Sequence, residues 1–228
     1  MSGSSYTKSM NWEVTMKRSA CIILLICLAG TTFTFAQETK PVELPPPQTD
    51  IGKPLMQVLR LRQTARAFDT RALPVQELSN LLWAAFGINR PESGKRTAPS
   101  AMNWQEIDVY VALPEALYLY DAKTNILKPI VSKDLREATG RQPFVKDAPL
   151  NLVYVADAAR MKNANAQDQI LYSAADVGFI AQNVYLYCAS QGLAAVMRGL
   201  VDREALAKVM NLRPDQKVMF AQTVGYPK

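Results

Sequence analysis

One stretch of this chain, residues 167–191, constrains the fold more than any other. Apolar or small side chains recur on nearly every side of it, from Ile170 through Val177 and Val184 to Cys188. As a helix rising 1.5 Å per residue, this stretch would span roughly 37 Å, about the diameter of a small domain. A helix that is apolar almost all round must be covered on more sides than an ordinary surface helix. The rest of the domain therefore has to be built around it.

The composition of this helix indicates what covers it. Asp176, Gln182 and Asn183 interrupt the apolar surface too often for a membrane span, which needs about 20 predominantly apolar residues. We therefore expect the extra apolar face to pack against a second copy of the chain, giving a homodimer. Gly192 follows directly and suits the residue that ends many helices.

Apolar periodicity predicts helices and strands along the rest of the chain. Helices are expected at 54–62, 74–86, 132–139 and 202–210. Strands are expected at 107–111, 150–156, 193–198 and 217–224, with a hairpin that pairs 116–120 with 126–131. Tyr118 and Tyr120 fall on one face of this hairpin, and we interpret them as cross-strand packing partners rather than catalytic acids.

Histidine is absent from all 228 residues. No Ser-His-Asp or Cys-His nucleophile and no His-ligated metal site can be built from this chain. An enzyme made from it must use carboxylates, Lys, Tyr or a cofactor that brings its own reactivity. The formal net charge of +6 is a mild excess rather than a clustered basic face, so we expect no nucleic-acid function.

Residues 1–36 are interpreted as an N-terminal extension and a secretory signal peptide. Lys17 and Arg18 precede the apolar run 20–29, which has the length of a signal-peptide core, and small residues end at Ala36. Cleavage near Ala36 predicts a secreted or periplasmic protein. A membrane anchor is disfavoured because the run is short. A lipoprotein attached through Cys27 is a less favoured alternative.

Removal of this segment changes the charge and the cysteine content. The net charge of the mature protein falls to +4, because three positive and one negative side chain leave. Cys188 alone remains, so no internal disulfide can form, and we interpret it as a small core residue. Residues 37–50, which contain Pro45-Pro46-Pro47, are predicted to form a Pro-rich linker or extended arm. The globular domain is expected to cover residues 51–228.

Arg62, Thr64 and Arg66 form a candidate anion-binding cluster. The two arginines share a face if the segment is helical, and all three side chains share one side if it is extended. Guanidinium groups bind phosphate oxygens bidentately and stay charged at any working pH, so the cluster suits a phosphate. A solvated basic helix end is the alternative interpretation of the same residues.

The segment 62–68 also resembles the Arg-Arg-Ser-x-Arg-x-Phe signature near the start of the nitroreductase family of flavoenzymes. Further resembling segments follow in the family's order: 81–87, 96–101, 117–121, 178–186, Gly192-Leu193 and Gly225-Tyr226-Pro227. The resemblance covers the chain from Pro54 to its C-terminus. The hairpin and the loop 99–101 look most like the branch that contains the SagB-type dehydrogenases, which oxidise thiazoline and oxazoline rings in modified peptides.

This resemblance implies an α+β fold of three layers, with a central mixed, mainly antiparallel sheet flanked by helices. It also implies an intertwined homodimer with FMN at each subunit boundary. The FMN phosphate would be held by Arg62, Gln63, Thr64 and Arg66, with Lys228 as a further cation. The flavin ring would be lined by a loop that comes from the partner subunit, namely Pro99, Ser100, Ala101 and Asn103.

Met197, Arg198 and Gly199 match the family's strand-to-loop segment, whose backbone N–H groups face the flavin N5 atom. Gln142 is the candidate for the pyrimidine edge. Arg198 stands where nitroreductases of the reducing type usually carry an acidic residue. A cation directed at the ring would favour the anionic reduced flavin, whereas a solvent-facing side chain would leave only a backbone contact.

The predicted function is FMN-dependent hydride transfer through flavin N5. The substrate would be a nitroaromatic or quinone-like compound, or a thiazoline/oxazoline-type ring, with NAD(P)H as one candidate electron donor. No catalytic side chain and no metal ligand is assigned. The alternative is a non-catalytic flavin- or peptide-binding module, because a fold does not dictate a function.

Overall fold

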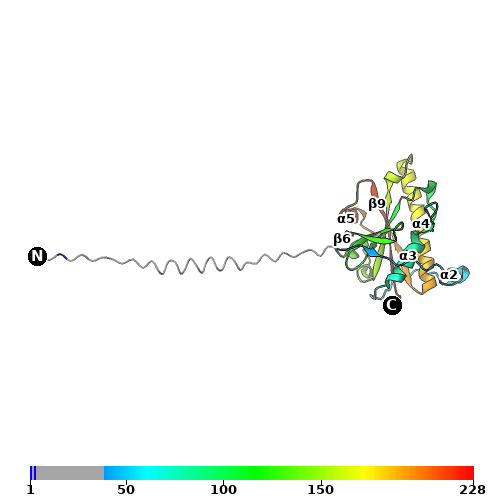
Figure 1. The fold of residues 1–228 in the computed structure, drawn as a ribbon, viewed down its shortest axis with the longest axis horizontal. Helices are drawn as coiled ribbons and strands as arrows, with labels where there is room; N and C mark the ends of the chain where they lie inside the picture. The colour runs from blue at the N-terminus through cyan, green and yellow to red at the C-terminus, as the bar shows by residue number, and fades with distance from the viewer. Residues whose placement is uncertain (2, 4–38) are drawn as a thin grey trace. The chain divides into compact units, whose positions relative to one another are not determined.

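The computed structural model describes residues 1, 3 and 39–228, and the fold comprises residues 39–228 (Figure 1). The predicted signal-peptide core and the cleavage site near Ala36 lie outside the described residues. Among the helices of the described part, none is both long and apolar enough to cross a membrane.

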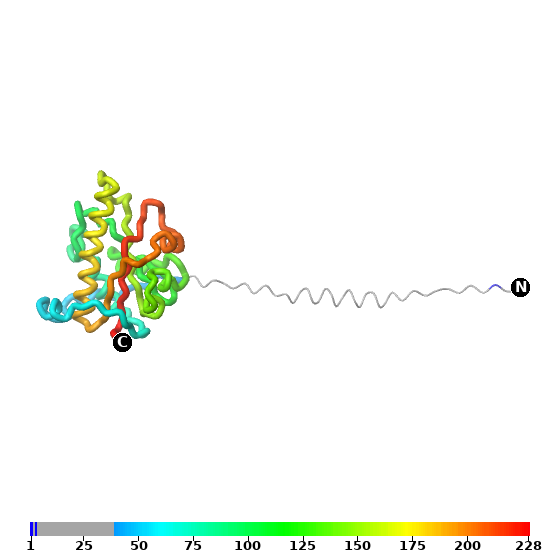
Figure 2. The backbone as a smooth tube through the Cα atoms, turned by 180° about the vertical axis from the view of Figure 1, so that it is seen from behind, coloured from blue at the N-terminus to red at the C-terminus, as the bar shows by residue number. Residues whose placement is uncertain are grey.

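A seven-stranded sheet forms the centre of the domain, in the order β1-β6-β5-β4-β7-β9-β8. Each neighbouring pair in it is antiparallel. Its strands are β1 (Val42–Glu43), β4 (Ile107–Ala112), β5 (Leu117–Asp121), β6 (Ile126–Val131), β7 (Leu150–Asp157), β8 (Ala194–Arg198) and β9 (Gln216–Gly225). Figure 2 shows β9 running through the domain toward the C-terminus, beside β8. β8 is therefore an edge strand, which leaves one side of its backbone open to other partners.

Four α-helices accompany the sheet: α2 (Leu55–Leu61), α3 (Val75–Phe86), α4 (Ala166–Gln191) and α5 (Arg203–Val209). α4 is the long helix predicted from the apolar stretch. Its N-cap is Asn165, whose side chain accepts from the N–H groups of Gln167 and Asp168. It ends at Gly192, whose φ of 74° is left-handed. These caps explain why the helix begins and ends where it does.

The helix predicted at 132–139 is wrong, because only a 3₁₀ turn forms there, at Glu137–Thr139. Asp134 Oδ1 accepts from the N–H of Arg136 at 2.9 Å, a local side-chain bond that competes with a regular helix. A short ribbon, β2 (Ile88–Arg90) paired with β3 (Lys95–Arg96), forms where apolar periodicity predicts neither a helix nor a strand.

Both faces of the sheet are covered, which confirms the three-layer α+β fold. Ile107, Val109 and Val111 of β4 point into a core shared with α3 and α4. The alternate residues Tyr110 and Ala112 point into a second core shared with α5. Figure 1 shows α3 and α4 side by side, with α5 across the sheet from them.

The tyrosines of the hairpin are packing residues, as predicted. Tyr118 and Tyr120 are both buried in the α3/α4 core, and burial raises the pKa of each phenol to about 12. Cys188 is buried in the same core, and burial raises the pKa of its thiol, as expected for an inert core residue.

Residues 39–50 form an extended arm that packs on the domain. β1 pairs with β6, and Leu44 is buried in the core. The side-chain amide of Asn125 donates to the carbonyl groups of Leu44 and Pro45 at 3.2 and 2.9 Å. The folded unit thus includes this arm as well as residues 51–228.

α4 leaves one stripe uncovered within a single chain. Val177, Ile180 and Val184 on its inner side are buried. The stripe consists of Leu171, Ala175, Gly178, Phe179 and the half-buried Leu186. Phe179 at the centre is 48% exposed, which is unusual for a large apolar side chain in the middle of a long helix.

Candidate functional site

The segment 62–66 lies along the open edge of β8. Arg62 ends α2 with φ −59° and ψ 120°, so the chain leaves the helix in an extended conformation. The N–H of Ala65 donates to the carbonyl of Ala195 at 3.0 Å. Phe68 is buried and its ring centroid lies 5.4 Å from that of Phe144, which anchors the end of the segment. Of the two geometries allowed by the sequence, the extended one is the one that forms.

Tyr185 of α4 connects this segment to β8. Its hydroxyl lies 3.3 Å from Thr64 Oγ1 and accepts from the N–H of Met197 at 2.8 Å. The guanidinium of Arg62 lies 5.4 Å from the centroid of the same ring, a favourable cation–π distance. Sequence reasoning counted Tyr185 among the apolar residues of the helix and missed this role. The available signal was that the hydroxyl of a packed tyrosine usually needs a partner.

The arginines of the cluster are available to an anion. Among the described residues, neither Arg62 nor Arg66 forms an ion pair with a carboxylate. Arg66 and Thr64 are exposed and Arg62 is half-buried. Two guanidinium groups beside a hydroxyl, with no acidic partner, fit a phosphate group. This observation favours the binding cluster over a solvated helix end.

Gln63 and Lys228 lie at the borders of the cluster. A cavity of about 240 Å³ is lined by Gln63, Ala65, Tyr185 and Pro227, among others. Pro227 forms a β-bridge with Phe68, which brings the neighbouring Lys228 to the end of the segment 62–68. The C-terminal residues and the cluster are therefore close in space although they are far apart in the sequence.

We expect Tyr185→Phe to lower the free energy of unfolding by about 1 to 2 kcal/mol, because the N–H of Met197 loses its acceptor. Urea denaturation measures this change. Tyr172→Phe is the matched control, because Tyr172 is exposed on the same helix. Equal unfolding midpoints for the two variants would show that the hydrogen bonds of the Tyr185 hydroxyl do not stabilise the fold.

The side chain of Arg198 points into the protein, so the solvent-facing alternative is wrong. Only 3% of the residue is exposed. Its guanidinium donates to Thr139 O at 2.7 Å, to Asn151 Oδ1 at 3.0 Å and to Thr223 Oγ1 at 3.0 Å. Burial lowers its pKa to about 10, so the group stays cationic at neutral pH. Among the described residues its partners are all neutral.

Gln142 lies beside this arginine. A Cβ on Gly140 would collide with Arg198 Nη1 and would lie 2.8 Å from Gln142 Oε1. The guanidinium of Arg198 and the side-chain amide of Gln142 therefore both lie against this glycine, which has no side chain to keep them away. Gln142 Oε1 is buried and has no hydrogen-bond partner among the described residues. Such an orphaned acceptor fits a ligand that carries an N–H group. The neighbouring Arg141 instead pairs with Asp202 on the surface, at 3.3 Å.

The loop that carries Pro99, Ser100, Ala101 and Asn103 lies elsewhere in the chain. The N–H of Ala101 donates to Asp176 Oδ2 on α4 at 3.0 Å. Asp176 precedes Tyr185 by nine residues, a separation of about 13 Å along the helix. One chain therefore contains two separate groups of the predicted site residues, and it does not bring them together.

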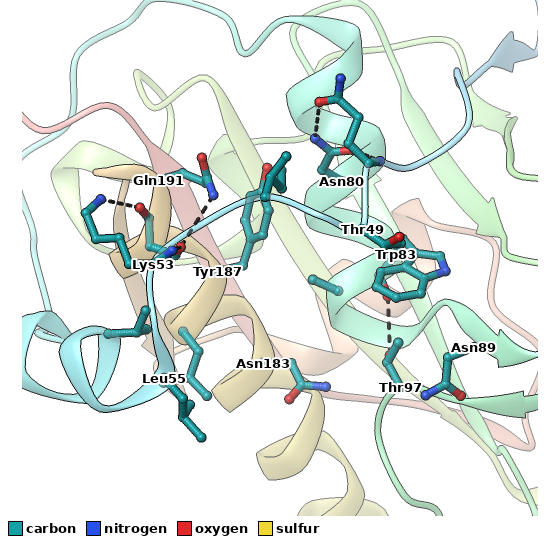
Figure 3. A pocket seen from close by; sticks show the side chains of 16 residues that line it. Thr49, Lys53, Leu55, Asn80, Trp83, Asn89, Thr97, Asn183, Tyr187 and Gln191 are labelled. Atoms are coloured by element: carbon teal, nitrogen blue, oxygen red, sulfur yellow. Dashed lines mark hydrogen bonds between the residues drawn. The ribbon is translucent and has the colours of Figure 1, made fainter.

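A second cavity, of about 450 Å³, opens between the N-terminal arm, α3 and α4 (Figure 3). None of the predicted site residues lines it. The polar groups of its two large aromatic residues already form hydrogen bonds within the protein. Trp83 Nε1 donates to Ile88 O at 3.2 Å, and the Tyr187 hydroxyl donates to Glu77 Oε1 at 2.7 Å. Trp83 is half-buried at this cavity. The cavity is separate from the Arg62–Arg66 cluster.

Comparisons with solved structures agree with this fold. A Ralstonia eutropha JMP134 protein assigned to the nitroreductases is 46% identical, with 83% of this chain and 90% of that chain covered and a TM-score of 0.80. The NADPH:FMN oxidoreductase of Vibrio harveyi, in complex with NAD⁺, is 20% identical, with coverage of 76% and 69% and a TM-score of 0.58. A chain of the Escherichia coli microcin synthetase McbBCD complex, with truncated pro-MccB17 bound, is 18% identical, with coverage of 97% and 98% and a TM-score of 0.65.

The last two similarities, at low identity, show the fold alone. The family model of the nitroreductases matches residues 59–226, which is most of the chain. This range runs from α2 through the Arg62–Arg66 cluster and both groups of site residues to the end of β9. The protein is therefore a member of the nitroreductase family.

Proposed function

We propose that this nitroreductase-family oxidoreductase depends on FMN and works as a homodimer. The observation that carries the proposal is the extended Arg62–Arg66 segment, held on the edge of β8 with two arginines that have no carboxylate partner among the described residues. Bound FMN would supply the hydride chemistry at N5 that a histidine-free chain lacks. The Vibrio harveyi relative, named as an NADPH:FMN oxidoreductase, supports flavin and NAD(P)H use.

In this proposal, different residues of one chain bind different parts of the cofactor. Arg62, Thr64 and Arg66 hold the phosphate, with Gln63 beside them and Lys228 at the border. Gln142 Oε1, which is buried without a partner among the described residues, accepts from the pyrimidine edge. The backbone of residues 197–199 lies along the ring. These side chains bind and orient the cofactor, and none of them has to transfer a proton.

The second subunit completes the site in this proposal. The uncovered stripe of α4, with Phe179 48% exposed at its centre, packs against the same stripe of a second copy. Two such helices crossing near Gly178 bring Asp176 of one subunit toward the Tyr185 region of the other. The loop 99–103 of each subunit then lies at the cofactor of its partner, which accounts for the separation of the two groups within one chain.

Loss of both phosphate-binding arginines is expected to abolish FMN retention. Each lost charge-assisted contact costs about 1.5 to 3 kcal/mol, so Arg62→Ala combined with Arg66→Ala should weaken FMN binding by at least about a hundredfold. The absorbance spectrum of the purified protein, before and after denaturation and with added FMN, measures this.

Arg60→Ala is the matched control for this experiment, because Arg60 is exposed at the end of α2, next to the cluster. This variant should retain the two flavin absorbance bands. A wild-type protein that is colourless and takes up no added FMN would refute the proposal.

The substrate follows from the same site. A nitroaromatic or quinone-like compound, or a thiazoline/oxazoline-type ring, would stack on the flavin in the slot between subunits. The resemblance of the hairpin and the loop 99–101 to the SagB-type branch favours the thiazoline/oxazoline-type ring. Turnover of bound flavin by any donor would separate an oxidoreductase from the non-catalytic binding module, which is the second candidate.

Export of the protein is also part of this proposal. The signal-peptide interpretation of residues 1–36 rests on the sequence. In the periplasm or outside the cell NAD(P)H is scarce, so export favours another electron donor or reaction in the oxidising direction. Fractionation of cells that produce the full chain, with N-terminal sequencing of the product, tests cleavage near Ala36.

A further inference from the structure

The loop 99–105 is a strained part of the described backbone. Met102, Asn103 and Gln105 have φ angles of 50°, 55° and 48°, in the left-handed region that non-glycine residues avoid. Each such residue costs roughly 1 kcal/mol or more. A conformation of this kind persists only where the surrounding structure holds it. The contacts beneath the loop are therefore important for its shape.

Two buried carboxyl groups accept hydrogen bonds from this loop. Glu106 is 0% exposed, and its Oε2 accepts from Ser100 Oγ at 3.2 Å. Asp176 of α4 is 3% exposed, and its Oδ2 accepts from the N–H of Ala101 at 3.0 Å. Ser100 Oγ in turn accepts from the N–H of Gln105 at 2.8 Å. Two consecutive loop residues are thus each fixed by one carboxyl group.

No cation compensates this pair within the described residues. Glu106 Oε1 has no hydrogen-bond partner, and no Lys or Arg bonds to either carboxyl group. Two arginines lie near the pair, but both bond to Gln105 and not to either carboxyl group. Arg96 Nε donates to Gln105 Oε1 at 2.8 Å, and Arg160 Nη1 donates to Gln105 O at 2.7 Å.

Burial and the nearby Asp176 carboxylate raise the pKa of Glu106. Both effects disfavour a second negative charge, because two carboxylates that share a buried site cannot both ionise readily. A proton shared with Asp176 would also satisfy the otherwise unpartnered Glu106 Oε1.

We infer that Glu106 carries a proton, which it donates in a hydrogen bond to Asp176, and that this proton keeps the loop 99–105 in its strained shape. When the proton leaves, two negative charges face each other, and their repulsion releases Ser100 and Ala101. Glu106 is therefore a positioning residue. Only the consequence for FMN rests on the proposed function, in which this loop lines the flavin of the partner subunit.

A rise in pH is expected to destabilise the loop 99–105. The folded-state pKa of Glu106 lies above its unfolded value of 4.5. Its protonated form therefore contributes stability that is fully present below this value and is lost as pH rises through the folded pKa. The loop should be most ordered under acidic conditions and should loosen as the pH increases.

Hydrogen exchange of the peptide 97–106, followed by mass spectrometry from roughly pH 4 to 9 and corrected for intrinsic rates, tests the inference. Protection of the wild-type loop should fall by about tenfold across this range, the equivalent of about one hydrogen bond. In Glu106→Gln the amide donates to Asp176 without titrating, so protection should stay high at every pH. In Glu106→Ala protection should be low throughout.

Glu137→Gln, a change at an exposed glutamate outside the loop, should retain the wild-type profile. Constant protection of the wild-type loop across this range would overturn the inference, and so would a Glu106→Gln profile that follows the wild type. Because Glu106→Gln preserves size and shape, the test does not depend on whether Glu106→Ala folds.

Titration with FMN over the same pH range gives an independent second readout. The ratio of the wild-type affinity to the Glu106→Gln affinity should fall with rising pH, because ionisation of the FMN phosphate affects both proteins alike. If the protein binds no FMN at any pH, the proposed function fails, while the exchange profiles still decide whether the carboxyl pair holds the loop.

Discussion

Gly178→Leu is expected to separate the two subunits while each chain remains folded. Gly178 lies at the centre of the exposed α4 stripe, and a Cβ built there meets nothing within 4 Å in its own chain. Replacement of a helical glycine even improves local helix propensity, by up to about 1 kcal/mol. The substitution should therefore spare the monomer.

The expected damage is confined to the interface between copies. In the proposed homodimer, two-fold symmetry would place an added side chain on both subunits, and overpacking costs typically 1 to 3 kcal/mol at each position. The dissociation constant of this dimer should rise between about 30-fold and 20,000-fold. In the proposed function each FMN site includes the partner's loop 99–103, so bound flavin should be lost together with the dimer.

Sedimentation velocity at several protein concentrations, with the flavin absorbance followed in the same run, measures both effects. Lys208→Leu is the matched control, because it adds the same side chain at an exposed position of α5, away from the stripe. A Gly178→Leu protein that remains dimeric and yellow would show that the stripe is not the interface.

Arg198→Lys is expected to destabilise the protein more than Arg198→Met, the reverse of the usual order for a conservative change. The guanidinium is bonded to Thr139, Asn151 and Thr223 in a buried site whose described partners are all neutral. Lysine retains the buried charge but cannot reproduce the planar fork that reaches all three. Methionine loses the same bonds, but it also removes the cost of burying a charge.

The expected loss for Arg198→Lys is about 3 kcal/mol, or roughly 6 to 12 °C in melting temperature for a chain of this length. Arg198→Met should lose about 1 kcal/mol, because removal of the buried charge offsets part of the cost of the lost bonds. Differential scanning calorimetry at neutral pH measures both. Arg203→Lys, at an exposed arginine, provides the control. A lysine variant as stable as the methionine variant would contradict the buried-cation description.

Periodicity alone was sufficient for the long elements. α4, α3, β4 and β7 form where apolar spacing predicts them, because each must bury a continuous apolar face. The failures are short elements. The ribbon of β2 and β3 lies within a run of turn-forming residues, and the helix predicted at 132–139 is replaced by local side-chain bonds around Asp134. Propensity over a few residues is too weak to decide such cases.

The candidate site was only partly predictable. Arg62, Thr64 and Arg66 were found because their residue types and spacing suit a phosphate in either backbone geometry. Their approach to Tyr185 was not found, because it depends on a contact between residues more than a hundred positions apart. The Glu106–Asp176 pair was missed for the same reason, since neither carboxylate is unusual in its own local sequence.

The sequence by itself determined that no histidine chemistry is possible, that a long apolar helix must lie at the centre, and that two arginines flank a hydroxyl. These properties follow from residue type and from spacing along one segment. Only the tertiary structure decided that the arginine segment lies extended on β8, that Arg198 points into the interior, and that two buried carboxyl groups each bond to the same strained loop. Each of these depends on distances between segments remote in sequence, which are set by how the sheet and helices pack and not by local periodicity.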